Sequence, residues 1–175
     1  MTQITDNDMI VRRVSVNRTR TPQATLDATG RKQYTDKDVV ETMPMGEGEE
    51  ADVYFFKPKP SEYTRPGYMS DDDLEKCLEI RGIVSDHYAQ AAVNEEDPAF
   101  ADDYPNGTHW KHDGRWHFAS FSHWLDERSV GVLRYDFGWD DDWWFGGVRK
   151  YQVPMVTCLP DGRQGIIVLH EPLVP

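Results

Sequence analysis

The segment from Trp139 to Trp144 holds three consecutive aspartates between tryptophans, in the order Trp-Asp-Asp-Asp-Trp-Trp. Carboxylates accept hydrogen bonds and attract cations, while an indole ring offers a rigid surface for stacking. The aspartates can form a turn, which this residue type stabilises through its own backbone. They can also join the tryptophans in a site for a sugar or a cation, or hold Mg²⁺ or Ca²⁺, although the glycine and glutamate of a calcium-binding loop are missing. The candidate binding residues are Trp139, Asp140, Asp141, Asp142, Trp143 and Trp144.

Histidines form the second cluster of chemically active residues, at His109, His112, His117 and His123. Asp113-Gly114 predicts a two-residue hairpin turn that pairs Trp110 with His117. This register puts His112 and His117 on one side of the sheet and His109 on the other. Zinc needs ligands that converge to about 2.1 Å from one ion, so we assign no metal site. We expect half-exposed sheet histidines, with a pH-sensitive His112 and His117 pair as the alternative.

No complete catalytic motif accompanies these clusters. Ser120 and Ser122 lie near histidines, but no Gly-x-Ser-x-Gly elbow surrounds them, and strand alternation explains their spacing. Asp136 and Asp140 could act as paired acids of a glycosidase, yet carboxylates are so frequent here that such pairs arise by chance. Gly46-Glu47-Gly48 is too acidic to hold a phosphate. We therefore predict no catalytic residues and no cofactor.

Charge is unevenly distributed along this chain, whose net charge is −12. Residues 10–37 carry seven basic and two acidic side chains, residues 38–56 six acidic and no basic ones, and residues 71–103 eleven acidic and two basic ones. The basic and acidic segments can attract each other, within one molecule or across a dimer. An acidic surface could instead bind a protein partner with a basic surface, whereas seven positive charges are a poor footprint for direct nucleic-acid binding. Within the acidic middle, the candidate binding residues are Asp71, Asp72 and Asp73.

Cysteine content and hydropathy indicate in which cellular compartment the protein is expected. Cys77 and Cys158 match no zinc or redox spacing, so we expect two reduced, half-buried thiols. The first residues lack the basic and apolar regions of a signal peptide, and no apolar run approaches the roughly 20 residues of a membrane span. A cytoplasmic location with no membrane association is the expectation.

The front half of the chain is predicted to hold helices and two strands that position these residues. Residues 9–16 and 53–56 read as strands. Short helices should begin at Thr21 and at Thr35-Asp36, ending before Gly30 and Pro44. One long helix should start at the Ser70 cap and run to Ala92, with Gly82 as a weak point inside it.

The back half is predicted to form three hairpins. They turn at Asp113-Gly114, between strands 131–139 and 143–153 at Asp140–Asp142, and at Pro160-Asp161-Gly162. All six tryptophans lie between residues 110 and 145, where we expect the core. The predicted fold is one α+β domain over residues 1–175, with an antiparallel β meander in the C-terminal half packed against one long helix and short N-terminal helices.

Three functions are compatible with this pattern. The leading hypothesis is a small acidic cytoplasmic protein that acts by non-catalytic protein–protein interaction, in one form as an inhibitor that mimics nucleic acid by presenting carboxylates where a target expects phosphates. The alternatives are a ligand-binding or hydrolytic enzyme with its pocket on the Trp-rich sheet, and a structural subunit of a larger assembly. Whether the chain forms a homo-oligomer stays open.

Overall fold

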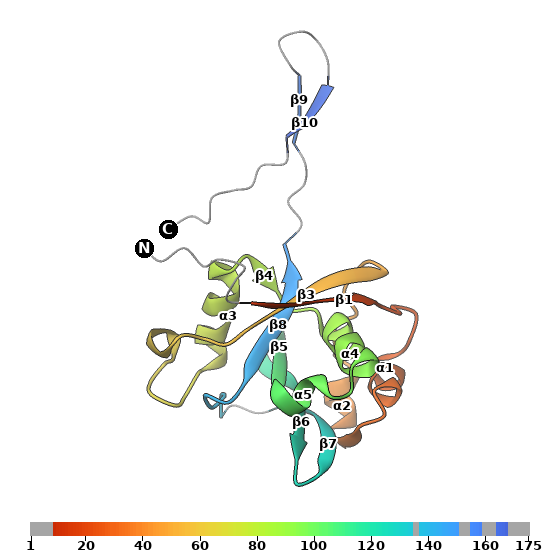
Figure 1. Cartoon of the computed structure of the whole chain (residues 1–175), viewed down its shortest axis with the longest axis vertical. Helices are drawn as coiled ribbons and strands as arrows, with labels where there is room; N and C mark the ends of the chain where they lie inside the picture. The colour runs from red at the N-terminus through yellow and green to blue at the C-terminus, as the bar shows by residue number, and fades with distance from the viewer. Residues whose placement is uncertain (1–8, 135–136, 151–154, 159–163, 168–175) are drawn as a thin grey trace.

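A computed structural model describes residues 9–134, 137–150, 155–158 and 164–167. Its main feature is an eight-stranded mixed sheet, in the order β1-β3-β8-β5-β6-β7-β2 with β4 paired to β8 (Figure 1). The strands are β1 (Ile10–Ser15), β2 (Lys32–Thr35), β3 (Glu50–Phe56), β4 (Ile83–Val84), β5 (Asn106–His112), β6 (Arg115–Trp124), β7 (Glu127–Arg134) and β8 (Trp144–Arg149). The α+β class predicted from the sequence is thereby confirmed.

Side-chain caps begin several of the helices. Thr21, Ser70 and Asp86 each accept a hydrogen bond from a backbone N–H of the first turn that follows. The α-helices are α1 (Pro22–Ala28), α2 (Lys37–Val40), α3 (Asp71–Ile80), α4 (His87–Glu96) and α5 (Phe100–Asp103), with a 3₁₀ turn at Pro60–Glu62. None of these described helices has the length and apolar character that crossing a bilayer requires.

The single long helix predicted from Ser70 to Ala92 is wrong. Gly82, with a φ of +63°, ends α3 in the left-handed conformation that glycine adopts most readily. Ile83–Val84 then pairs with β8, and Asp86 caps a second helix, α4. The helical spacing thus runs through two helices separated by a short strand.

The prediction of an antiparallel meander is also wrong in part, because the sheet contains both parallel and antiparallel strand pairs. β5, β6 and β7 are antiparallel neighbours, and Trp110 pairs with His117 as predicted. Asp113 and Gly114 turn between β5 and β6 with φ angles of 49° and 73°, as a type I′ turn requires. However, β8 does not pair with β7. It lies between β3 and β5, parallel to β5, while β2 joins β7 in parallel.

The third predicted hairpin pairs as expected. β9 (Met155–Cys158) and β10 (Gln164–Ile167) are antiparallel, with Gln164 opposite Cys158. The predicted turn at Pro160-Asp161-Gly162 lies outside the described residues.

Two cores cover the two faces of the sheet. One joins α1, α2 and α4 to the face that carries Trp110, Phe121 and Val132. The other packs α3 on the face that carries Phe145 and Trp139. Figure 1 shows α3 on one side of the sheet and α1 and α4 on the other. Cys77 is buried in the α3 core, and its burial raises the pKa of the thiol to about 11.

Ion pairs connect the basic N-terminal segment to the acidic segments within one molecule, which confirms one of the two predicted arrangements. Arg13 pairs with Glu50 and Asp52 across β1 and β3. Arg18 binds both carboxylate oxygens of Asp86 at 2.6 and 2.7 Å. Part of the negative charge is therefore balanced within the molecule.

Candidate functional site

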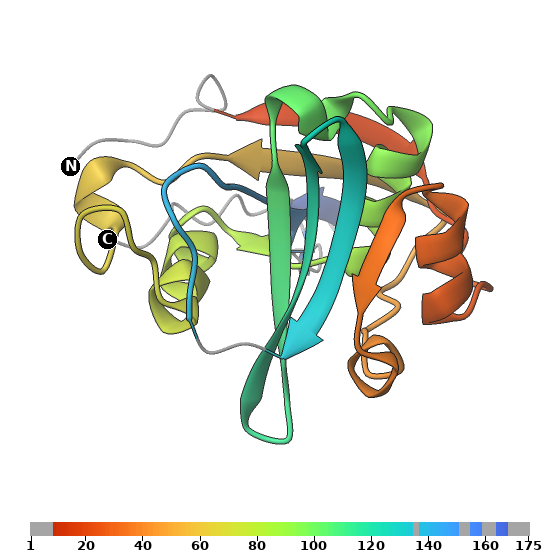
Figure 2. The same cartoon turned by 90° about the horizontal axis from the view of Figure 1, so that it is seen from below.

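A backbone bridge brings the two predicted acidic segments together. The N–H of Met69 donates to the carbonyl of Trp139, and the N–H of Trp139 donates back to the carbonyl of Met69, both at 2.8 Å. The indole Nε1 of Trp139 also donates to Asp71 Oδ1 at 2.9 Å. Figure 2 shows the segment that leads into β8 running beside α3. The first turn of α3 and the Asp140–Asp142 segment are therefore neighbours.

Asp71 is buried and links Trp139 to a histidine. Its Oδ1 lies 2.8 Å from His109 Nδ1, and Glu75 Oε2 lies 2.9 Å from His109 Nε2. Burial lowers the pKa of His109, but hydrogen bonds to the two carboxylates outweigh burial, so the pKa is raised above its ordinary value. The imidazolium is thereby held between two acids. Both ring nitrogens are occupied, so the group acts as a clamp between α3 and β5.

The exposed Asp72 is oriented by a tryptophan of β6. Trp116 lies flat on His109, with ring centroids 4.3 Å apart and an interplanar angle of 13°. Its Nε1 donates to Asp72 Oδ1 at 3.0 Å. The Asp72 carboxylate is therefore exposed to solvent but fixed in direction.

Asp73 has a local role. It accepts hydrogen bonds from Lys76, Thr64 and Ser70, and these lower the pKa of its carboxyl to about 2. The structure therefore places Asp73 in the cap of α3, where its charge is already balanced by Lys76.

The three aspartates between the tryptophans form an exposed turn, as one of the three interpretations predicts. The N–H of Asp142 donates to Asp140 Oδ1 at 3.0 Å. Within the part of the chain that the structure describes, no ion pair reaches Asp140, Asp141 or Asp142. Burial, followed by the charges of Asp141 and Asp140, raises the pKa of nearby Tyr63.

The three tryptophans of this segment are distributed over both faces of the sheet. Trp139 is buried, and Trp143 packs on it with ring centroids 5.5 Å apart. Trp144 contacts Tyr104 on the opposite face, at 5.1 Å. Trp143 and Trp144 are both half-buried. Trp139 is therefore core, Trp143 borders the acidic turn, and Trp144 is remote from it.

Sequence reasoning missed His109, Glu75 and Trp116 as parts of this arrangement. The hairpin register does place His109 on the face opposite His112 and His117, as predicted. The expectation of half-exposed histidines is wrong for His109 and His117, which are 2% and 1% exposed. Glu75 lies four residues after Asp71, about one helical turn away. This spacing puts both side chains on the same face of a helix and could have indicated that they share a partner.

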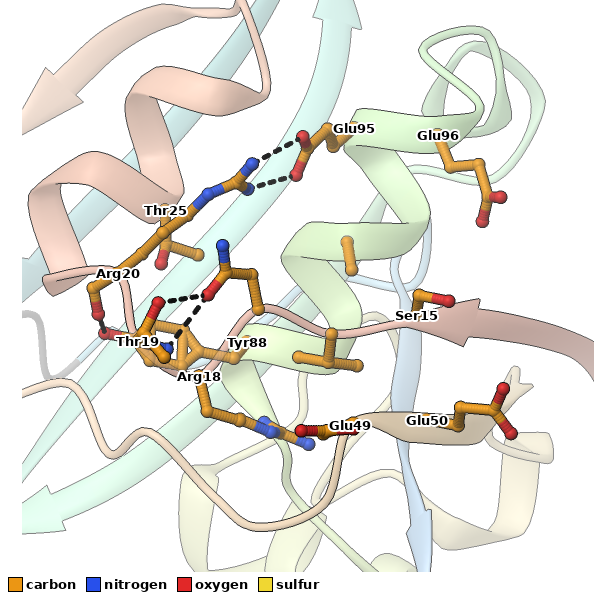
Figure 3. Close-up of a pocket in the computed structure, with 13 residues that line it drawn as sticks. Ser15, Arg18, Thr19, Arg20, Thr25, Glu49, Glu50, Tyr88, Glu95 and Glu96 are labelled. Atoms are coloured by element: carbon orange, nitrogen blue, oxygen red, sulfur yellow. Dashed lines mark hydrogen bonds and ion pairs between the residues drawn. The ribbon is translucent and has the colours of Figure 1, made fainter.

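A cavity of about 740 Å³ lies elsewhere, where β1 ends against α1 and α4 (Figure 3). Arg20 binds both oxygens of Glu95, at 2.7 and 3.2 Å, so its guanidinium is already engaged. Glu49 and Glu96 also line the cavity. No tryptophan lines this cavity or the smaller one at the β5–β6 turn. The larger cavity therefore does not match the pocket on the Trp-rich sheet that the enzyme alternative needs. The smaller one lies on that sheet and is lined by His117, but by none of the candidate tryptophans.

Comparisons with protein-family models, with curated proteins and with solved structures find no match for this chain.

Proposed function

We propose that this chain is a cytoplasmic, non-catalytic binding protein that contacts a basic surface of a partner protein. The contact surface is the acidic face, defined as Asp72, Asp140, Asp141 and Asp142. The observation that carries the proposal is that two acidic segments far apart in sequence are held side by side by the Met69–Trp139 bridge. Among the described residues, no ion pair reaches these four carboxylates. Lys76, whose pKa is raised chiefly by its hydrogen bond to Asp73, is also influenced by the charge of Asp72.

Acids that already form an ion pair with an arginine are less available to a partner. Asp86, Glu95 and Glu62 each form an ion pair with an arginine. The acidic face forms none, and like charges held close together repel one another. A cationic partner would therefore meet carboxylates that are not already ion-paired.

One carboxylate of the acidic face, that of Asp72, also has a rigid support. Asp72 is fixed by Trp116, which stacks on His109, and His109 is clamped by Asp71 and Glu75. Carboxylates held in place by buried groups lose little conformational entropy when a partner binds. An array of this kind suits an inhibitor that presents carboxylates where a target expects phosphates.

Binding of a synthetic deca-arginine peptide tests this function. We expect the triple variant D140N/D141N/D142N to bind at least about tenfold more weakly than the unmodified chain at low salt. The matched control E47Q/E49Q/E96Q removes the same number of negative charges from other exposed positions and should lose much less affinity. Equal losses in the two variants would show attraction by net charge alone and would refute the acidic face.

The two alternatives stay hypotheses that other measurements address. A monomer at micromolar concentration in solution would argue against a structural subunit. Hydrolytic activity lost on substitution of residues along the Trp-rich sheet would favour the enzyme.

A further inference from the structure

Nitrogen-bearing side chains gather at the open end of β5, β6 and β7, on the face opposite His109. His112 pairs with Arg115 across the β5–β6 hairpin, and His117 pairs with Arg134 across β6 and β7. Arg115 and His117 are two residues apart on one strand, so these four side chains share one face of the sheet. They line a cavity of about 260 Å³ together with Asp113.

The arginines of this molecule fall into two groups by their partners. Five other arginines form ion pairs with carboxylates, namely Arg13, Arg18, Arg20, Arg81 and Arg128. Within the described residues, no carboxylate is recorded within ion-pair distance of Arg115 or Arg134. Arg115 and Arg134 line the same cavity, so both guanidinium groups are available to one anion there. Guanidinium forks match the oxygens of carboxylates and phosphates, so an anion from outside the chain is the natural partner.

His117 fixes the direction of one of these forks. Its Nδ1 donates to the carbonyl of Arg115 at 3.0 Å, which leaves Nε2 as an acceptor for Arg134 Nε at 3.2 Å. The two terminal nitrogens of Arg134 then have no recorded partner among the described residues. Burial, together with the charge of Arg134, lowers the pKa of His117, which agrees with a neutral ring in this acceptor role.

We infer that this cavity, the arginine pocket, binds the phosphate group of a small molecule between Arg115 and Arg134. Its volume is below the roughly 300–1,000 Å³ typical of pockets that enclose a whole ligand, so one tetrahedral oxyanion fits its size. A dianion balances two guanidinium charges, whereas a single carboxylate balances one. Asp113 does not fill this role, because its side chain is 90% exposed and its recorded contact is with His112 at 3.4 Å.

The inference does not depend on the acidic face, since the two surfaces share no residue. It is tested by titrating the full chain with inorganic phosphate and, separately, with ribose 5-phosphate at constant ionic strength, following backbone amide shifts by NMR. We expect saturable shifts at residues 112–117 and at Arg134, with a Kd below about 1 mM for at least one of the two. Binding of both ligands assigns recognition to the phosphate group itself, and binding of the ester alone assigns it to a phosphomonoester.

Arginine variants decide whether the pocket is responsible. R115Q and R134Q should each weaken binding at least about tenfold, because each removes charged hydrogen bonds to the anion. R128Q is the matched control, since Arg128 lies on the same strand as Arg134 and carries the same charge but is paired with Asp102. It should leave the affinity within about twofold. The inference would be overturned if neither ligand gave saturable shifts. It would also be overturned if R128Q weakened binding as much as R115Q and R134Q do.

Discussion

Trp139 donates its indole N–H to Asp71 at 2.9 Å, across 68 residues of chain. This hydrogen bond joins the two segments that carry the acidic face. Asp71 also accepts from His109, so a single buried carboxylate connects α3, β5 and the segment before β8. Local stability and the proposed binding function therefore depend on the same group.

Replacing Trp139 by phenylalanine removes the N–H but keeps an aromatic ring. We expect W139F to lower the free energy of unfolding by about 1–3 kcal/mol, because a buried charged acceptor loses a donor. Urea denaturation measures this loss. W143F is the control, since Trp143 packs on Trp139 and its indole forms no hydrogen bond with the residues that the structure describes. An unchanged unfolding free energy in W139F would contradict the role assigned to this bond.

The pair of Arg18 and Asp86 should be far more important than the exposed pair of Arg13 and Glu50. The Arg18 and Asp86 side chains are 13% and 5% exposed, and Arg18 also donates to three carbonyl groups of residues 45–48. We expect R18Q to cost about 3–5 kcal/mol, because it leaves a buried carboxylate without its cation. R13Q should cost about 1 kcal/mol or less. Thermal or urea unfolding compares the two, and similar losses would contradict this ranking.

His109 should make stability depend on pH. Its pKa is raised in the folded state, so its contribution is complete below the unfolded value near 6.5 and disappears as the pH rises through the folded value. The pKa of Glu75 is lowered, chiefly by the hydrogen bond to His109. Its contribution is present above about 4.5 and is lost at more acidic pH.

The stabilisation by this pair should therefore be largest between about pH 4.5 and 6.5. Unfolding free energies of the unmodified chain and H109Q, measured across pH 4–9, test this. The difference between them should shrink as the pH rises above neutrality. A difference that stays constant over the whole range would show that His109 contributes packing alone.

Substitution of Trp143 and Trp144 should separate binding from packing. The two residues are adjacent in the chain, but Trp143 borders the acidic turn and Trp144 contacts Tyr104 on the other face. Both are half-buried, so each alanine variant should cost less than the 3–5 kcal/mol typical of a buried tryptophan. W143A should also weaken deca-arginine binding, whereas W144A should not. Equal effects of the two on binding would argue against the assigned face.

Local signals in the sequence predicted local structure well. The caps at Thr21 and Ser70 and the Asp113-Gly114 turn are found as predicted, because each depends on a few neighbouring residues. The turn between β6 and β7 was not predicted. It uses Leu125 and Asp126 at φ angles of 47° and 62°, and leucine gives no indication of that conformation.

The pairing of strands that lie far apart in the chain could not be predicted from the sequence. The hydrophobic pattern of β8 fits any neighbour, and its place between β3 and β5 is decided by tertiary packing. Gly147 shows this dependence, because a Cβ there would collide with Val84 of β4. The acidic residues of the candidate site were predicted individually, but their convergence depends on the bridge between Met69 and Trp139. His109 was missed as their connection for the same reason.

Mapping the deca-arginine contact on the folded chain tests the central claim most directly. Amide shifts recorded by NMR during a titration at low salt should be concentrated at residues 71–75, at Trp116 and at residues 139–144. The same titration of D140N/D141N/D142N should show smaller shifts at these positions. Shifts centred instead on Glu49 and Glu96, at the cavity beside β1 and α4, would contradict the account and place the contact surface there.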